Sequence, residues 1–237
     1  MLRTLGQACA KAGCGVRQTS VSRCVDSNNV PQEIAKRQTT ASQQERVIIV
    51  EVSMCAISPE RVIRDHLLMK RTFETVEEIK RARVIDDYAV AGAVGALFYV
   101  EPFATLDIDL LVNLPASEGL LVSLEPIFSW LRSKGGIEFD AQGNVIIEGW
   151  PVQFLPVSDE LSAEALREAQ YLIFEQGLSV RVMRPEYLAI EALRLGRPKD
   201  RERVSLLLAA DEFESDRFLQ LVKRFGLEQK WAKFQSD

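Results

Sequence analysis

Two aspartates stand in an otherwise apolar run between residues 105 and 114, TLDIDLLVNL. The apolar and β-branched residues of this run predict a strand, in which residues two apart point to the same face. Asp107 and Asp109 therefore share one face, and the apolar residues beside them take the face that enters the core. Two neighbouring carboxylates repel each other, so this strand needs a cation or a donor to offset them. Oxygen ligands of this kind suit Mg²⁺ or Mn²⁺, which makes both aspartates candidate metal ligands.

A glycine begins the element just upstream of this strand. Residues 87–91 predict a short apolar strand, and residues 92–100 (GAVGALFYV) predict a compact helix that starts at Gly92. Backbone N–H groups and the positive end of the helix dipole make such a start a site for a triphosphate. Only a small residue lets phosphate approach the backbone there, and both Gly92 and Ala93 are small.

These two segments together resemble the DNA-polymerase-β-like nucleotidyltransferase superfamily. Its signature is a hydrophobic residue, then Gly-Gly or Gly-Ser, and then Asp-hydrophobic-Asp-hydrophobic. Residues 91–110 follow this order, with Ala93 at the second small position. The segment is similar to the small prokaryotic branch that includes AbiEii-type toxin nucleotidyltransferases. Downstream, Arg197-Pro-Lys199-Asp200 resembles the Lys-Asp motif of that branch. The resemblance covers roughly residues 70–235.

The resemblance implies an α+β fold, with a nucleotidyltransferase-type mixed β-sheet flanked by helices and a helical C-terminal part. It also implies a metal-dependent enzyme that moves a nucleoside monophosphate from an NTP to a hydroxyl of RNA, a protein or a small molecule. Asp107 and Asp109 would be catalytic and would bind Mg²⁺ or Mn²⁺. Gly92 and Ala93 would cradle the triphosphate, and Lys199 would neutralise its charge.

Three positions depart from the family's pattern. Ala93 stands where Gly or Ser is usual, Gln153 stands where a third carboxylate is expected, and Arg203 replaces an acid that often follows the Lys-Asp pair. A neutral amide is a poor general base and a poor metal-bridging ligand. The alternatives for the missing acid are Glu148, Asp140 and Asp159. A second function therefore stays open, in which the chain is a catalytically degenerate binding or regulatory protein, for example in a toxin–antitoxin pair with an antitoxin-like partner.

Composition divides the chain near residue 45. Ser, Thr, Gln, Asn and Gly dominate the first 44 residues without a sustained period, which is typical of a poorly ordered segment. A basic, acid-free start over residues 1–25 would also suit a transit peptide or an over-long gene start. We expect a poorly ordered extension over 1–45, an α/β core over 46–183 and a helical subdomain over 184–237. Residues 54–237 hold 22 Lys and Arg against 30 Asp and Glu, so any nucleic-acid contact needs a local basic patch.

Periodicity and turn residues predict the elements within this frame. The expected strands cover residues 46–52, 87–91, 105–114, 137–140, 145–148, 152–155 and 178–183. Helices are expected from Pro59, then over residues 73–85, 92–100, 120–132, 161–170, 186–195, 199–210 and 213–225, with a short helical tail.

The remaining features exclude other classes of function. The longest apolar stretch without a charge, residues 88–100, is too short to span a bilayer as a helix, so we expect a cytoplasmic protein with no membrane partner. All four cysteines lie within the first 55 residues, and His66 is the only histidine. This set is too sparse for a structural zinc site, and we expect His66 on a helix surface.

Overall fold

A computed structural model describes residues 59–100, 105, 107–115 and 122–236 of the chain, with side chains from residue 64 onward. The expected strand over 46–52, the extension over 1–45 and the four cysteines lie outside these residues.

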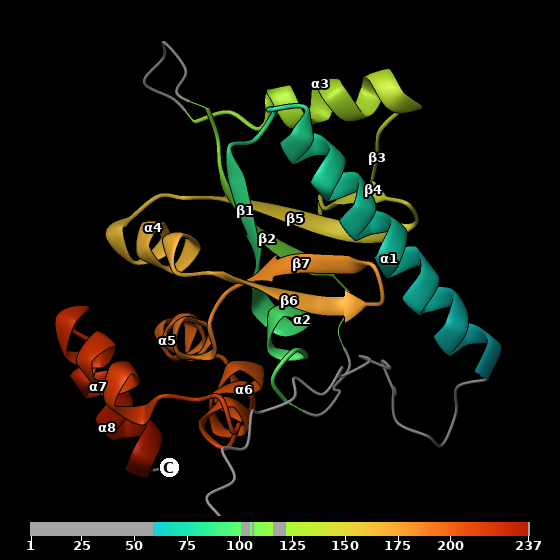
Figure 1. Ribbon diagram of the computed structural model, residues 1–237. Helices are drawn as coiled ribbons and strands as arrows, with labels where there is room; N and C mark the ends of the chain where they lie inside the picture. The colour runs from blue at the N-terminus through green and yellow to red at the C-terminus, as the bar shows by residue number, and fades with distance from the viewer. Residues whose placement is uncertain (1–58, 101–104, 106, 116–121, 237) are drawn as a thin grey trace, which may run out of the picture. The chain divides into compact units, whose positions relative to one another are not determined.

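The described residues form eight helices and seven strands (Figure 1). The helices are α1 (Pro59–Arg81), α2 (Gly92–Ala96), α3 (Glu125–Lys134), α4 (Glu160–Arg167), α5 (Pro185–Leu195), α6 (Pro198–Leu208), α7 (Ser215–Arg224) and α8 (Glu228–Ser236). The strands are β1 (Asp87–Val90), β2 (Ile108–Asn113), β3 (Glu138–Phe139), β4 (Val145–Ile147), β5 (Trp150–Pro156), β6 (Gln170–Glu175) and β7 (Leu178–Val182). The expected class, α+β with a mixed sheet and a helical C-terminal part, is confirmed.

The seven strands form one sheet in the order β3-β4-β5-β2-β1-β7-β6. β1 pairs with β7 and β2 pairs with β5 in parallel, whereas the remaining neighbours are antiparallel. The two central strands, β1 and β2, are almost wholly buried, as their continuous apolar composition predicts. Their pairing sets Val90 opposite Leu110, which brings the end of β1 beside the start of β2.

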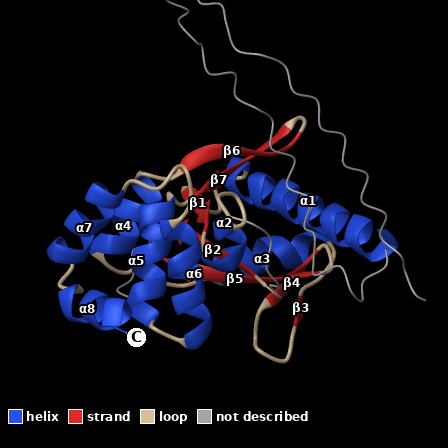
Figure 2. Cartoon of the chain, turned by 90° about the horizontal axis from the view of Figure 1, so that it is seen from below, coloured by secondary structure: helices blue, strands red, loops and turns tan. Residues whose placement is uncertain are grey.

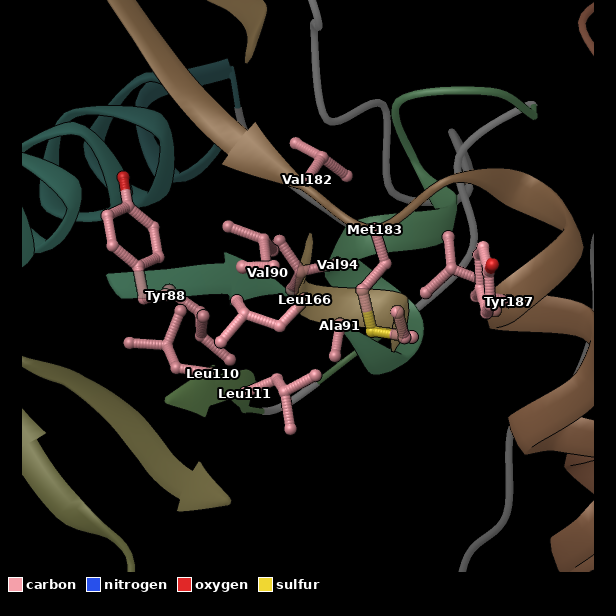
Figure 3. Close-up of a cluster of buried hydrophobic side chains, with 14 of the residues drawn as sticks. Tyr88, Val90, Ala91, Val94, Leu110, Leu111, Leu166, Val182, Met183 and Tyr187 are labelled. Carbon is pink, nitrogen blue, oxygen red and sulfur yellow. The ribbon is translucent and has the colours of Figure 1, made fainter. Parts of the chain in front are cut away.

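The core gathers around these central strands. Tyr88, Val90 and Leu110 are fully buried, and Met183 and Tyr187 reach the same cluster from the segment that follows β7 (Figure 3). Burying one side chain of this size contributes about 1.5–3 kcal/mol, so the cluster strongly fixes where β1 and β2 lie in the sheet.

Helix α1 packs against the sheet, and the last four helices form a separate group. One face of α1 buries four apolar residues, Met69, Phe73, Val76 and Ile79, and the ring of Phe73 packs edge-on against Phe174 of β6. Helices α5 to α8 form the C-terminal group, in which α5 packs against α2, α6, α7 and α8 (Figures 1 and 2). No helix in the part of the chain that the structure describes combines the length and apolarity that crossing a membrane requires.

Two expected helices have different bounds in the structure. The pattern over 73–85 belongs to the second half of α1, which ends at Arg81 because Arg83 takes a positive φ of 56°. Ile85 is buried all the same. The helix expected over 120–132 is α3, which begins at Glu125, in keeping with a proline in its first turn.

Three further expectations were wrong at their ends. The helix over 92–100 stops at Ala96, after which Phe98 and Tyr99 bond three residues back in tighter turns. The strand over 105–114 begins at Ile108, so Asp107 precedes it. The helix over 161–170 ends at Arg167, and residues 170–175 form β6, a strand that the sequence interpretation missed.

Candidate functional site

The turn from β1 into α2 lies directly against Asp109. The backbone N–H of Ala91 donates to the carbonyl oxygen of Asp109 at 2.8 Å. Gly92 takes a positive φ of 56°, and a Cβ at this position would overlap Oδ2 of Asp109 and come within 2.8 Å of its Cγ. Only glycine meets both conditions, because it tolerates this φ and carries no Cβ. The glycine and the carboxylate that the sequence singled out are therefore in contact.

Asp107 and Asp109 lie close enough to influence each other's charge. Asp107 is half-buried just before β2, and Asp109 is half-buried as the second residue of that strand. Burial, and then the negative charge of Asp107, raise the pKa of Asp109 to about 6. Two neighbouring carboxylates repel each other, and this repulsion contributes to the raised pKa of Asp109.

Three cations partly offset this rise in the pKa of Asp109. Arg203, Lys199 and Arg197 each lower the pKa of Asp109 through their positive charge. They come from the start of α6, which packs against α2. The segment that resembles the Lys-Asp motif therefore lies near the aspartate pair, although about 90 residues separate the two in sequence. Of the three cations, the sequence interpretation had assigned only Lys199 to the site.

Asp200 anchors two of these cations. Its side chain is fully buried, and it accepts hydrogen bonds from Nε and Nη2 of Arg197 at 2.6 and 3.1 Å and from Nη1 of Arg203 at 3.4 Å. Burial alone would raise the pKa of Asp200, but the hydrogen bonds and charge of Arg197 hold that pKa below its usual value. Asp200 is therefore an internal anchor and not a solvated residue of the helix start.

Gln153 lies where a third carboxylate would be needed. The parallel pairing of β2 and β5 sets Gln153 opposite Asp109, and the Gln153 side chain is exposed. Residues opposite each other in a pair of strands share a face, so the amide lies beside the carboxylate. Gln153, which departs from the family's pattern in the sequence, therefore lies next to Asp109.

The three alternative acids have other roles. Asp140 accepts from the N–H groups of Gln142 and Asn144 at 2.9 and 2.8 Å. Asp159 caps α4 and pairs with Arg194 at 2.5 Å. Glu148 lies in the turn between β4 and β5 with a positive φ of 50°. Within residues 64–236, apart from the gaps in the description, no three His, Cys, Asp or Glu side chains gather as a metal site.

The residues at hand fit one divalent ion and not a site built from three carboxylates. Mg²⁺ is commonly held by one or two carboxylates together with waters and substrate phosphates. Asp107 and Asp109 can supply those carboxylates. An uncharged amide at Gln153 adds no charge that would balance a second ion.

The expected phosphate cradle is smaller than the sequence indicated. α2 spans only five residues, and its first hydrogen bond joins the N–H of Gly95 to the carbonyl oxygen of Ala91. A helix this short has a small dipole. The backbone N–H groups at its start would therefore be the main attraction for an anion. The side chain of Ala93 is buried, so any contact of this residue with phosphate would come from its backbone.

His66 lies on α1 and joins it to β6. Its Nε2 lies 3.1 Å from Oε2 of Glu175, and its ring stacks on Phe174 with centroids 4.8 Å apart. It is not among the groups whose charge acts on Asp109.

Comparison with known proteins gives fold-level likeness alone. No protein-family model matches the chain, and a search of curated proteins gives no match. Among solved structures, the chain is similar to an antigenic nucleotidyltransferase-like protein from Paracoccidioides brasiliensis, with 16% identity over 73% of this chain and 91% of that chain and a TM-score of 0.44. It is also similar to the antibiotic-resistance factor ANT(2'')-Ia, with 14% identity over 73% of this chain and 96% of that chain and a TM-score of 0.46.

Proposed function

We propose that this chain is a nucleotidyltransferase, which moves a nucleoside monophosphate from an NTP to a hydroxyl of RNA, a protein or a small molecule. The observation that carries the proposal is the contact between Gly92 and Asp109, with Asp107 beside it and three cations in electrostatic reach. A carboxylate pair, a turn without a side chain and a set of cations are the parts that bind a polyphosphate with a divalent ion.

Each part has a distinct role in this proposal. Asp107 and Asp109 would hold Mg²⁺ or Mn²⁺, which would neutralise phosphate charge and polarise the α-phosphorus. The missing Cβ of Gly92 leaves room for the Asp109 carboxylate, the backbone of this turn would meet the phosphates, and Lys199 would offset their negative charge. A bond forms between the acceptor oxygen and the α-phosphorus, and the bond from that phosphorus to pyrophosphate breaks. Gln153 cannot take the hydroxyl proton, so the proton passes to another base or to water.

A transfer assay tests this proposal. The purified chain is incubated with NTPs labelled at the α-phosphate, total cellular RNA and protein, and Mg²⁺ or Mn²⁺. We expect label in an acceptor and a loss of at least about 100-fold in Asp107→Asn, because charge stabilisation supplies most of the rate in such transfers. Lys223→Gln, which removes an exposed cation on α7, is the matched control and should keep the wild-type rate. Equal labelling by wild type and Asp107→Asn would overturn the proposal.

The second candidate is a protein of the same fold that binds nucleotide without turnover. Gln153 opposite Asp109 favours it, because that position lacks the negative charge that a base or a second ion requires. Calorimetry with ATP and Mg²⁺, set beside the transfer assay, separates the two functions. Binding without transfer, together with transfer by Gln153→Asp, would identify the wild-type chain as the binding protein.

Membership of the AbiEii-like branch and an antitoxin-like partner are the finer parts of the same proposal. The Lys199-Asp200 motif supports them. Expression of the chain in a bacterial host tests the toxin role, since a toxin should arrest growth and Asp107→Asn should not. Normal growth with wild-type protein present at the same level would contradict this role.

A further inference from the structure

We propose that Arg197, positioned by the buried Asp200, is an anion-binding residue that holds a phosphate group next to the Asp107–Asp109 pair. The identity of its ligand, a nucleoside triphosphate, rests on the proposed function. The anion site itself is argued from the contacts below.

Only part of the Arg197 guanidinium is used inside the protein. Nε and Nη2 donate to the two oxygens of Asp200 at 2.6 and 3.1 Å, which fixes the plane of the group. Among the described residues, Nη1 of Arg197 donates no hydrogen bond, and the side chain is 50% exposed. A guanidinium carries five N–H donors in a planar fork, so one edge is bound and the other can meet a phosphate.

The position of Arg197 makes a phosphate its natural ligand. Asp200 chiefly raises the pKa of Arg197, and the charges of Asp109 and Asp107 add to this rise, so the guanidinium also lies within electrostatic reach of the pair. α6 also contacts α2, the helix that Gly92 begins. A triphosphate that meets Gly92 and the two aspartates at one end would therefore lie near Arg197 at the other.

The anchor explains why the cation stays in place opposite two carboxylates. Asp200 is fully buried, and it holds Arg203 as well as Arg197. Arg203 is 11% exposed and adds its positive charge to the same region. Fixed guanidinium groups can supply positive charge where the amide of Gln153 offers no negative charge to a second ion.

The start of α6 keeps contacts to Asp200 that do not depend on the Arg197 side chain. Asp200 already accepts from the backbone N–H of Arg197 at 3.2 Å and so caps α6 by itself. The pair at 2.6 Å joins a half-exposed guanidinium to a buried carboxylate. When the Arg197 side chain is removed, this backbone cap stays in place and Asp200 keeps its contact with Arg203, although it loses its main cation.

The test is metal-free binding of inorganic tripolyphosphate in EDTA, measured by calorimetry on the full chain. We expect Arg197→Gln to weaken binding about tenfold, since the variant loses a charge-assisted hydrogen bond to the anion. Arg197→Lys should recover part of that loss, and the control Lys223→Gln should bind like wild type. Asp109→Asn should bind more tightly than wild type, because it removes a negative charge beside the anion.

The four variants decide the proposal together. A gain in Asp109→Asn cannot come from misfolding, so that gain with a loss in Arg197→Gln supports the site. Wild-type binding by Arg197→Gln, or an equal loss in Lys223→Gln, overturns it. The outcome is independent of the transfer assay, because tripolyphosphate binding without metal requires no acceptor and no turnover.

Discussion

Gly92 is constrained by its backbone and by its neighbour at the same time. Its φ of 56° suits glycine, and any Cβ would overlap the carboxylate of Asp109. The sequence indicated the glycine and the aspartate as separate parts of a site, and the two residues are in contact in the structure. What the sequence could not indicate is that Asp109 itself would fill the space beside the glycine, because that depends on the β1–β2 register.

Gly92→Ala is expected to lose about 1–3 kcal/mol of unfolding free energy, from backbone strain and overlap with Asp109. Urea denaturation measures the loss. Gly177→Ala is the matched control, since Gly177 also has a positive φ, 87°, but a Cβ there meets nothing within 4 Å. The account predicts a clearly larger loss at Gly92. Equal losses would show that overlap with Asp109 plays no part.

The raised pKa of Asp109 predicts that the fold becomes less stable as pH rises. Its pKa is about 6 in the folded, metal-free chain and 3.8 as the ordinary value. Between these values the folded chain holds a proton that the unfolded chain has lost, so this group stabilises the fold less as pH rises. Asp109→Asn should therefore gain about 2–3 kcal/mol relative to wild type between about pH 4 and pH 7. A difference between the two proteins that stays constant with pH would contradict the raised pKa.

At the scale of elements, the strands of the central sheet were largely predictable and the ends of several elements were not. β1 and β2 are short, apolar and bounded by polar or turn residues, so their composition was decisive. β6 was missed because the apolar pattern of α4 continues into it with no glycine or proline between them. Only its pairing with β7 makes residues 170–175 a strand. The end of α2 at Ala96 depends in the same way on tertiary contacts, since the hydroxyl of Tyr99 donates to the carbonyl oxygen of Met183 at 3.0 Å.

The C-terminal helices depend on one buried acid. Glu186 in the first turn of α5 is fully buried, lies 3.3 Å from Nε of Arg184 and accepts from the backbone N–H of Glu214 at 2.8 Å. Glu186→Ala should cost about 2–3 kcal/mol, because it leaves Arg184 and the start of α7 without this partner. Glu214→Gln keeps that backbone donor and loses only an exposed pair, so it should cost less than about 1 kcal/mol. Thermal or urea unfolding compares the two, and a similar cost for both would contradict a special role for Glu186.

At the scale of the whole molecule, the site depends on segments far apart in the sequence. Gly92, Asp109, Gln153 and Arg197 come from four different elements or their flanks, and the sheet order together with the α5–α6 hairpin brings them together. The resemblance assigned Gly92 and Asp109 to a site and pointed to Gln153 as a departure, and this assignment stays a prediction. The sequence could not indicate that Asp200 is buried, because a Lys-Asp pair at a helix start usually faces solvent.

The division of the chain near residue 45 stays a prediction. We expect a chain that begins at residue 46 to unfold at the same temperature as the full chain, because the polar and aperiodic composition of residues 1–44 offers little to a core. Scanning calorimetry of the two chains checks this. A fall of more than a few degrees in the shorter chain would show that the extension contributes to the fold.

If Asp109 holds a metal ion together with a polyphosphate, its substitution should change the affinity for ATP in opposite directions in Mg²⁺ and in EDTA. In EDTA, Asp109→Asn should bind ATP more tightly than wild type, since it loses a repulsive charge. With Mg²⁺, the same variant should bind about tenfold more weakly, since it loses a metal ligand. The account predicts this reversal of sign. A variant that binds more tightly in both conditions would contradict it.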